Sequence, residues 1–315
     1  MKILVTGSKG VVGSKLVEVL KQKGHFVFGI DLFHAPEVYG HGLGKVAEDN
    51  YFRCDISEYR QIKDIVEYVS PELVFNCAAE FGRWNGEHFY EQVWKSNAIG
   101  TKNIIRLQEK HKFKLVHCSS SEVYGDYQDI MYEDILKEIP IAQMNDYAIS
   151  KKVNEMQIEN SRIQYDTKTV IVRIFNTYGP GEWYHPFRSV NCLFCYNLLH
   201  GNPITVYKGH TRTSTYIYDA VNAISNIADN FKPGEIYNIA SEERHTIEKL
   251  AEIILTKTGA RSSLVQYADK HEILTTKDKI VNAKKCKLDL NFESNVTLEE
   301  GVQKTLDWMK TYYNI

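Results

Sequence analysis

The first half of the chain alternates short apolar runs with segments of helical periodicity, and this alternation restricts the fold more than any other feature. The apolar runs are KILVTG, FVFGID, NYFRCDI, PELVFNCAA, FKLVHCSS and KTVIVRIFNTYG. Consecutive residues in them, such as Val74 and Phe75 or Leu115 and Val116, are apolar, which is typical of parallel strands covered by helices on both faces. We therefore predict an α/β protein built on a doubly wound parallel sheet.

The pattern changes after Tyr178. Pro180, Pro186 and Pro203 interrupt the chain, and the strands that follow, such as ITVY and EIYNIA, are short. We predict a first domain over residues 1–176, rejoined by about residues 211–238. The remainder, 177–315, is predicted to form a smaller mixed α/β C-terminal substrate domain.

The composition is that of an ordinary globular protein and excludes several kinds of partner. The 315 residues are 43% hydrophobic and 25% charged, with a net charge of -2 and no dense basic run, so we expect no nucleic-acid or membrane partner. The opening MKILVTG is too short for the apolar part of a signal peptide, and no run reaches the roughly 18 apolar residues of a membrane span. We expect a cytoplasmic protein.

The cysteines and histidines do not form a metal motif. Of the six cysteines, only Cys192 and Cys195 have a suggestive spacing, and no second pair of Cys or His lies at zinc spacing from them. We interpret these thiols as core residues and predict no metal.

The stretch TGSKGVVG joins the first apolar run to the first helical segment. It places Gly7, Gly10 and Gly13 as G-x-x-G-x-x-G, where they allow a tight turn, close approach to a pyrophosphate, and packing of the helix on the sheet. The run FVFGID ends at Asp31, 24 residues after Gly7, where an acid that binds ribose hydroxyls is expected. A turn and a solvated aspartate would not explain this spacing. Because a carboxylate repels a 2′-phosphate, NAD(H) is favoured over NADP(H).

These features predict that the sheet is of Rossmann type and binds NAD. The motif CDI, which ends the third apolar run, is expected near the adenine. From the glycine turn and the strand ends, the predicted cofactor residues are Gly7, Gly10, Val11, Val12, Gly13, Asp31, Leu32, Asp55 and Ile56.

The segment DYAISKK places Tyr147 and Lys151 four residues apart, on one face of a predicted helix. A free tyrosine has a pKa near 10, so it is a poor base at neutral pH. A lysine ammonium and an oxidised nicotinamide beside Tyr147 would favour its phenolate, which could then accept a proton. A surface Tyr/Lys pair is the alternative, and the glycine turn and the SSSEVYG segment argue against it.

Together, Gly7-x-x-Gly10-x-x-Gly13, Ser120 and Tyr147-x-x-x-Lys151 resemble the extended short-chain dehydrogenase/reductase family, specifically its nucleotide-sugar epimerases and dehydratases. The resemblance covers nearly the whole chain. It implies NAD as cofactor, a nucleotide-diphosphate sugar as substrate, and a Rossmann domain followed by a nucleotide-sugar-binding domain. It also implies a homodimer in which the long helices over residues 87–111 and 146–164 pair with their copies.

Further motifs extend the resemblance. NCAAE is similar to the strand end that contacts the cofactor in the family, and SNAIGT to its Asn-x-x-Gly-Thr helix, which implies cofactor contacts for Ala78, Ala79 and Asn97. RIFNTYGPG is similar to the segment whose asparagine, here Asn176, contacts the sugar diphosphate. RTSTYIYDAV is similar to an element whose arginine, here Arg212, is a candidate diphosphate ligand.

The segment SSSEVYG carries polar side chains at the end of a buried strand, where ligand chemistry belongs in such a sheet. By the resemblance, Ser120 takes the place of the catalytic Ser/Thr, and Tyr147 accepts the C4 hydroxyl proton while a hydride goes to NAD. Glu122 lies where 4,6-dehydratases and sugar-acid decarboxylases carry a glutamate. We therefore predict a 4,6-dehydratase in which Glu122 removes the C5 proton.

Other activities stay open. Many dehydratases of the family have aspartate where this chain has Ser121, so no acid for the leaving hydroxyl is evident. The segment GEWYHPFRSVNC differs from the usual dehydratase loop and is faintly similar to that of a 3,5-epimerase. An epimerase acting at C4 or at C3/C5 and a UDP-uronate decarboxylase are alternatives. From a different class, a noncatalytic NAD-binding sensor is disfavoured by the Tyr147/Lys151 pair.

Several further polar residues are candidates for substrate binding. Glu80 and Arg83 follow the fourth strand and are predicted to line the sugar pocket, and Arg188 is predicted to bind phosphate. Val206 and Tyr207 end the run ITVY and are predicted to flank the nucleobase of the substrate. Each charged residue here is also compatible with a surface ion pair.

Overall fold

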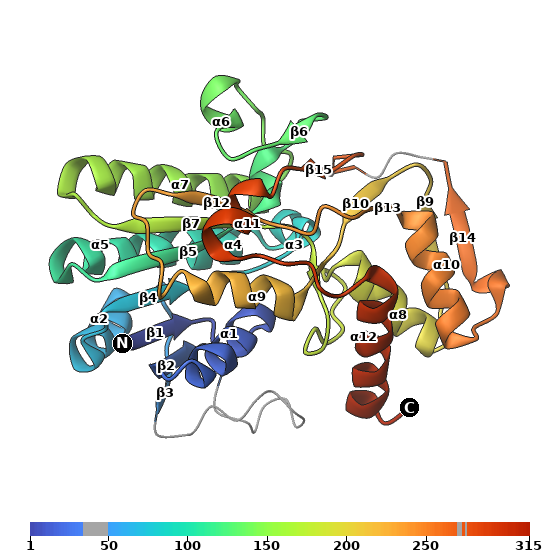
Figure 1. The fold of residues 1–315 in the computed structure, drawn as a ribbon, viewed down its shortest axis with the longest axis horizontal. Helices are drawn as coiled ribbons and strands as arrows, with labels where there is room; N and C mark the ends of the chain where they lie inside the picture. The colour runs from blue at the N-terminus through green and yellow to red at the C-terminus, as the bar shows by residue number, and fades with distance from the viewer. Residues whose placement is uncertain (34–49, 270–272, 275) are drawn as a thin grey trace.

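The central feature of the fold is a seven-stranded sheet in the order β12-β7-β5-β4-β1-β2-β3, in which every pairing is parallel (Figure 1). This computed structural model describes residues 1–33, 50–269, 273–274 and 276–315. The strands are β1 (Lys2–Thr6), β2 (Phe26–Asp31), β3 (Tyr51–Arg53), β4 (Leu73–Asn76), β5 (Lys114–Ser120), β7 (Thr169–Ile174) and β12 (Ile236–Ile239). The predicted doubly wound parallel sheet is therefore confirmed.

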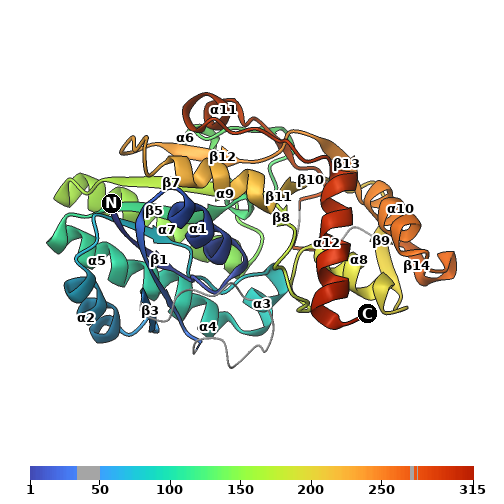
Figure 2. The same cartoon turned by 60° about the horizontal axis from the view of Figure 1, so that its bottom comes forward.

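Helices cover both faces of the sheet, because the strands direct apolar side chains toward both faces. The covering helices are α1 (Val11–Gln22) and α9 (Ile217–Asn226) on one face, with α2 (Tyr59–Val69), α5 (Thr101–His111) and α7 (Asp146–Tyr165) on the other (Figure 2). In β1, Ile3 and Val5 pack in a core cluster with α1 and α9, whereas Leu4 packs in a separate cluster with α2 and α5. This two-sided burial is what fixes a parallel sheet.

The expected long helix over residues 87–111 is divided. The chain forms α3 (Arg83–His88), a break at Phe89, α4 (Tyr90–Val93), a π-helical stretch η2 (Trp94–Gly100), and then α5. Periodicity at 3.6 residues cannot reveal such a stretch, because the inserted residue changes the face that each later side chain occupies. Within the described residues, no helix is both long and apolar enough to cross a membrane.

A second, smaller unit lies beyond the carboxyl ends of the strands and holds the C-terminus (Figure 1). It consists of α8 (Val190–Leu199), α10 (Ile247–Thr258) and α12 (Leu298–Tyr313), with the parallel pair β9 (Ile204–Tyr207) and β14 (Val265–Ala268). Cys192 and Cys195 are buried in its core, which agrees with their interpretation as core thiols.

The described residues also form several short elements. They are η3 (Ser121–Tyr124), β6 (Ile130–Met131), α6 (Ile135–Glu138), β8 (Thr177–Tyr178), β10 (Thr211–Thr213), β11 (Thr215–Tyr216), β13 (Arg244–Thr246), η4 (Ser262–Leu264), β15 (Ile280–Val281) and α11 (Lys284–Leu290). The pair of β6 with β15 matters most for the site, because it brings residues near 280 beside the end of β5.

Candidate active site

A cavity of about 880 Å³ lies between the carboxyl end of the sheet and the smaller unit. Its wall combines the β1–α1 turn, the ends of β2, β4 and β5, the start of α7, and residues of the smaller unit near α8, β9 and β10. This is where a doubly wound sheet binds its ligands.

The glycine turn at one end of the cavity has the shape that a dinucleotide requires. Gly7 has a φ of +66°, and a Cβ there would lie 2.7 Å from the Cα of Ala78. A Cβ on Gly13 would lie 2.1 Å from the carbonyl oxygen of Gly7. The turn closes with a 3.0 Å hydrogen bond from the Gly10 amide to that same oxygen, and α1 starts at Val11 with no side-chain cap. The amides that open α1 therefore face the cavity as a pyrophosphate site.

Asp31 ends β2 at the wall of the same cavity. Its carboxylate accepts hydrogen bonds from the backbone amides of Lys9, at 2.8 Å, and Leu32, at 2.7 Å. Burial raises the pKa of Asp31, and these amides oppose the increase. Each carboxylate oxygen can accept a further bond, so the side chain is held in place while it can still bind a ribose diol. The donor set and the glycine cradle thus fit NAD.

Tyr147 and Lys151 come from the first turns of α7. The helix is capped by Asn145, whose side-chain oxygen accepts a 2.8 Å hydrogen bond from the Ala148 amide. The Lys151 Nζ donates to the Cys118 carbonyl oxygen at 2.8 Å and lies 6.0 Å from the centre of the Tyr147 ring. The two side chains therefore lie on one face of the helix, as predicted.

The protein alone does not lower the pKa of Tyr147. Burial raises it to about 12, a hydrogen bond with Ser120 opposes this increase, and the charge of Glu122 adds to it. Burial also lowers the pKa of Lys151 to about 8. The lysine ammonium is directed at the Cys118 carbonyl rather than at the phenol, so a phenolate needs further positive charge in the site.

Glu122 lies in η3, immediately after β5, where its amide donates a 3.2 Å hydrogen bond to the Ser120 hydroxyl. Its carboxylate forms an ion pair with Lys279, whose Nζ is also 3.2 Å from the Ser121 Oγ. Burial alone would raise the pKa of Glu122, but the positive charges of Lys279, Arg83 and Arg212 lower it overall. Glu122 is therefore ionised at neutral pH and can accept a proton.

The sequence prediction missed Lys279. This lysine is fully buried, and burial lowers its pKa against the opposing charge of Glu122. In the segment KDKIV it reads as an ordinary surface lysine, and only the pairing of β15 with β6 brings it to the site.

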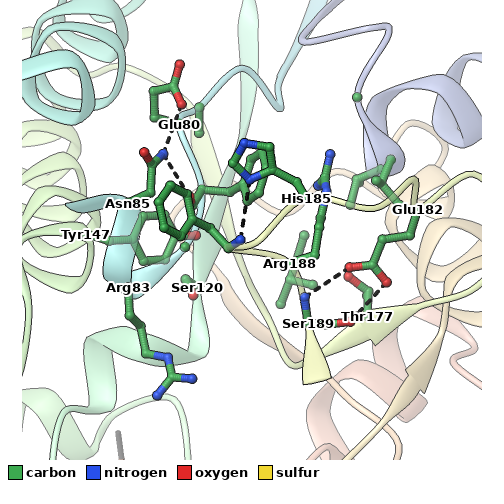
Figure 3. A pocket seen from close by; sticks show the side chains of 18 of the residues that line it. Glu80, Arg83, Asn85, Ser120, Tyr147, Thr177, Glu182, His185, Arg188 and Ser189 are labelled. Atoms are coloured by element: carbon green, nitrogen blue, oxygen red, sulfur yellow. Dashed lines mark hydrogen bonds between the residues drawn. The ribbon is translucent and has the colours of Figure 1, made fainter. Parts of the chain in front are cut away.

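The opposite wall of the cavity carries aromatic and charged side chains. The Arg188 guanidinium carbon lies 3.8 Å from the centre of the Phe81 ring and 4.4 Å from that of Trp183. Glu182 accepts a 3.0 Å hydrogen bond from the Ser189 hydroxyl, which is the N-cap of α8. Figure 3 shows Arg188, Glu182 and Ser189 on the side of the cavity away from Tyr147 and Ser120.

Glu80 and Arg83 extend in different directions from the loop after β4. Glu80 accepts a 3.1 Å hydrogen bond from the Asn85 side chain, and Figure 3 shows these two side chains pointing toward one another. The guanidinium of Arg83 extends away from them, past Ser120 and Tyr147. Its charge contributes to lowering the pKa of Glu122, so Arg83 acts electrostatically on the proposed base.

The cavity collects most of the predicted residues. Those that line it are Gly7, Gly10, Val11, Val12, Gly13, Asp31, Leu32, Asp55, Ile56, Ala78, Ala79, Glu80, Arg83, Ser120, Ser121, Glu122, Tyr147, Lys151, Asn176, Arg188, Tyr207 and Arg212. Lining residues that the sequence analysis did not single out include Asn85, Glu182, His185, Thr205 and His210.

Two of the predicted residues, Val206 and Asn97, do not line the cavity, and the local structure explains why in each case. Val206 is fully buried in the core of the smaller unit, because β9 alternates and its cavity-facing residues are Thr205 and Tyr207. Asn97 is buried in η2, where its side chain bonds the backbone of Glu80 at 2.8 and 3.1 Å and the Ser150 hydroxyl at 3.0 Å. It thus holds the loop that carries Glu80 rather than facing the cavity.

Within the part of the chain that the structure describes, no group of three or more His, Cys, Asp or Glu side chains could hold a metal ion.

Comparisons with known proteins identify the family. The profile of the NAD dependent epimerase/dehydratase family matches residues 3–240. The chain is 29% identical to a UDP-N-acetyl-alpha-D-glucosaminuronate decarboxylase of Bacillus cytotoxicus, over 99% of both proteins. It is 27% identical to a dTDP-glucose 4,6-dehydratase of Salmonella typhimurium, over 98% of this chain and 92% of that protein.

Solved structures give the same result. A UDP-glucose 4-epimerase of Thermotoga maritima, crystallised with UDP-glucose, superposes with a TM-score of 0.87 at 25% identity, over 99% of this chain and 100% of that one. The family match covers more than half of the chain and includes the glycine turn and the Tyr147/Lys151 pair. The chain is therefore an NAD-dependent enzyme and belongs to the NAD dependent epimerase/dehydratase family.

Proposed function

We propose that the protein is a nucleotide-sugar 4,6-dehydratase. The observation that carries the proposal is Glu122, an ionised carboxylate on the cavity wall beside the Ser120 and Tyr147 pair. The reaction needs one group that accepts the proton of the C4 hydroxyl and a separate base that removes the C5 proton, and these residues supply both functions.

The residues act in sequence on the sugar. Ser120 hydrogen-bonds the C4 hydroxyl, and Tyr147 accepts its proton. NAD held by the glycine turn and Asp31 would supply the hydride chemistry at C4 and C6, and its positive charge would favour the Tyr147 phenolate. A ketone at C4 acidifies the C5 proton, which Glu122 removes. Departure of the C6 hydroxyl follows, and Glu122 returns its proton to C5, so the product is a 4-keto-6-deoxy sugar.

The substrate is a nucleotide-diphosphate sugar. Arg212, buried on β10, and Arg188, held between two aromatic rings, present guanidinium groups to the cavity, and such groups bind phosphate in a bidentate manner. Asn176 and Tyr207 line the same cavity and complete the site for the diphosphate and the nucleobase of the substrate. The Thermotoga maritima relative is crystallised with UDP-glucose, which supports this substrate class.

Decarboxylation of a nucleotide-uronic acid is the second candidate. It is favoured by the charges near Glu122, because Arg83, Arg212 and Lys279 all lower its pKa and could also attract a sugar carboxylate. The Bacillus cytotoxicus decarboxylase is a relative over nearly its full length. A ketone at C4 is β to a carboxylate at C6, so the same first step would serve this reaction.

Product mass separates the candidates. The purified enzyme is incubated with a panel of nucleotide hexoses and nucleotide uronic acids, and products are followed by mass spectrometry. A dehydratase product has lost one water, a decarboxylase product has lost carbon dioxide, and an epimerase product has the mass of its substrate. Retention of the C6 hydroxyl in every substrate turned over would falsify the dehydratase proposal. Tyr147→Phe should abolish turnover, and unchanged turnover would favour a noncatalytic role for the pair.

We also propose that two copies pair through η2, α5 and α7. Apolar side chains are exposed on η2 and α7: Ile99 is 52% exposed, Met156 61% and Ile163 64%. Apolar side chains exposed on neighbouring helices mark a protein interaction site where they form a contiguous patch. Sedimentation at micromolar concentration should give a dimer, and Met156→Asp should shift it toward monomer. A wild-type monomer would contradict the proposal.

A further inference from the structure

Elimination of the C6 hydroxyl requires a proton donor as well as a base, and an ionised Glu122 cannot donate. The residue before it, Ser121, lines the cavity beside it. A serine hydroxyl is a weak acid by itself, so its surroundings decide whether it can serve as the donor.

Those surroundings are dominated by Lys279. Its Nζ is 3.2 Å from the Ser121 Oγ and is ion-paired with Glu122, while its own side chain is 2% exposed and does not line the cavity. Lys279 therefore contacts both cavity residues from behind. Because an ammonium has only donors, the Ser121 oxygen accepts from it, and the Ser121 hydrogen is left to be donated elsewhere.

The backbone around Lys279 is fixed to the same part of the fold. The residues after it, in β15, pair with β6, and the Thr276 hydroxyl donates to the Gly125 carbonyl oxygen just past η3. The Asn145 side chain, which caps α7, also donates to the Leu274 carbonyl oxygen at 3.2 Å. The segment is thus attached to η3 and to the start of the helix that carries Tyr147.

We propose that Lys279 is a positioning residue for the elimination step, which holds the carboxylate of Glu122 as the base and orients the Ser121 hydroxyl toward the departing C6 hydroxyl. This inference rests on the proposed dehydratase activity. It assigns the acid that the sequence comparison with other dehydratases leaves open.

Protons and electrons balance in this scheme. Glu122 takes the C5 proton as the C5–C6 double bond forms and the C6–O bond breaks. The Ser121 proton goes to the departing oxygen to give water. Glu122 later returns its proton to C5 as the hydride removed from C4 is delivered to C6. Tyr147 has then gained the C4 hydroxyl proton and Ser121 has lost one, so exchange with solvent restores both groups.

The test separates the base from the acid. Exchange of solvent deuterium into C5 reports on Glu122, and release of water reports on Ser121. Ser121→Ala should retain C5 exchange but lose water on the order of 100-fold more slowly. Lys279→Met should slow water loss by a similar factor. Lys277→Met is the matched control, because that side chain is exposed in the same segment, and it should behave as wild type.

The pH dependence of C5 exchange is a second measurement, and it should not change if Lys279 has only a structural role. The charged and titratable groups that act on Glu122 are Lys279, Arg83 and Arg212, with Tyr147 across the site. Lys279→Met removes one of the three cations, so the acid limb of C5 exchange should move to higher pH. Lys279→Arg keeps the charge and should leave that limb near its wild-type position.

The possible failures are distinct. Wild-type enzyme that loses no water from any sugar contradicts the dehydratase activity and the inference with it. Wild-type enzyme that loses water, together with Ser121→Ala or Lys279→Met variants that do so equally fast, overturns the inference alone. An acid limb that stays in place in a folded Lys279→Met variant overturns it as well.

Discussion

Lys151 should destabilise the folded protein, and replacing it with methionine should reveal by how much. Burial lowers its pKa from 10.5 to about 8. At about 1.4 kcal/mol for each pKa unit, keeping this lysine charged below about pH 8 costs about 3 kcal/mol of folding free energy. Lys151→Met also removes the hydrogen bond to the Cys118 carbonyl, which contributes about 1 kcal/mol. We expect the variant to be more stable than wild type by about 2 kcal/mol at neutral pH.

The pH dependence gives the sign of the effect. Between about pH 8 and 10.5 the unfolded lysine keeps its proton while the folded one has lost it. The unfolded state then binds more protons, so the Lys151 contribution to stability rises with pH in this window. The advantage of Lys151→Met should therefore shrink above about pH 8 by about 1.4 kcal/mol per pH unit and disappear near about pH 9.5.

Urea unfolding of cofactor-free protein at several pH values measures this difference. The wild-type curve alone is not informative, because buried thiols such as Cys195 and Cys286 have a higher pKa in the folded state than in the unfolded state. These thiols therefore also make the unfolding free energy depend on pH in this range. Subtracting the two curves cancels those groups, and Lys284→Met provides an exposed-lysine control. A Lys151→Met variant that is less stable at neutral pH, or a difference that does not change with pH, would refute the reasoning.

Three other perturbations have definite expected outcomes. Glu155→Gln leaves Arg173 buried without its bidentate partner, whose bonds are 3.0 and 2.8 Å, and should lower the unfolding free energy by about 3–5 kcal/mol in urea. Gly13→Ala forces a Cβ to within 2.1 Å of the Gly7 oxygen and should weaken NAD binding at least about 10-fold in calorimetry. Asp31→Asn removes the charge that repels a 2′-phosphate, so the NADP to NAD affinity ratio should rise by about 10-fold in the same assay.

The sequence could predict those parts of the site that depend on local spacing. Gly7, Gly10 and Gly13 are constrained by one turn, and Tyr147 and Lys151 by one helix face, so their relation follows from backbone geometry. The polar residues that end β5 reach the cavity for a similar reason, because strand ends of a parallel sheet meet at one edge.

The remaining site residues depend on contacts that local periodicity does not encode. Lys279 meets Glu122 across 157 positions, through two paired strands of two residues each. The sequence analysis predicted that Val206 faces the cavity, but alternate residues of β9 face opposite sides, and Val206 faces the core. An error of one residue in the register of a strand exchanges its core-facing and cavity-facing residues. In Asn97 the residue type is compatible with cofactor binding, but the π-helical stretch directs it into a helix interface.

The two catalytic elements are held together by a charge pair that the sequence gives no reason to place in the core. Glu155 is one helical turn after Lys151, and it accepts a 2.6 Å hydrogen bond from the hydroxyl of Ser119, next to Ser120. Arg173 on β7 binds the same carboxylate. The Glu155 carboxylate joins α7 to β5 and β7. Its replacement should therefore change the distance between Tyr147 on α7 and Ser120 on β5. A Glu155→Gln protein that still folds should therefore lose more of its turnover than of its NAD affinity.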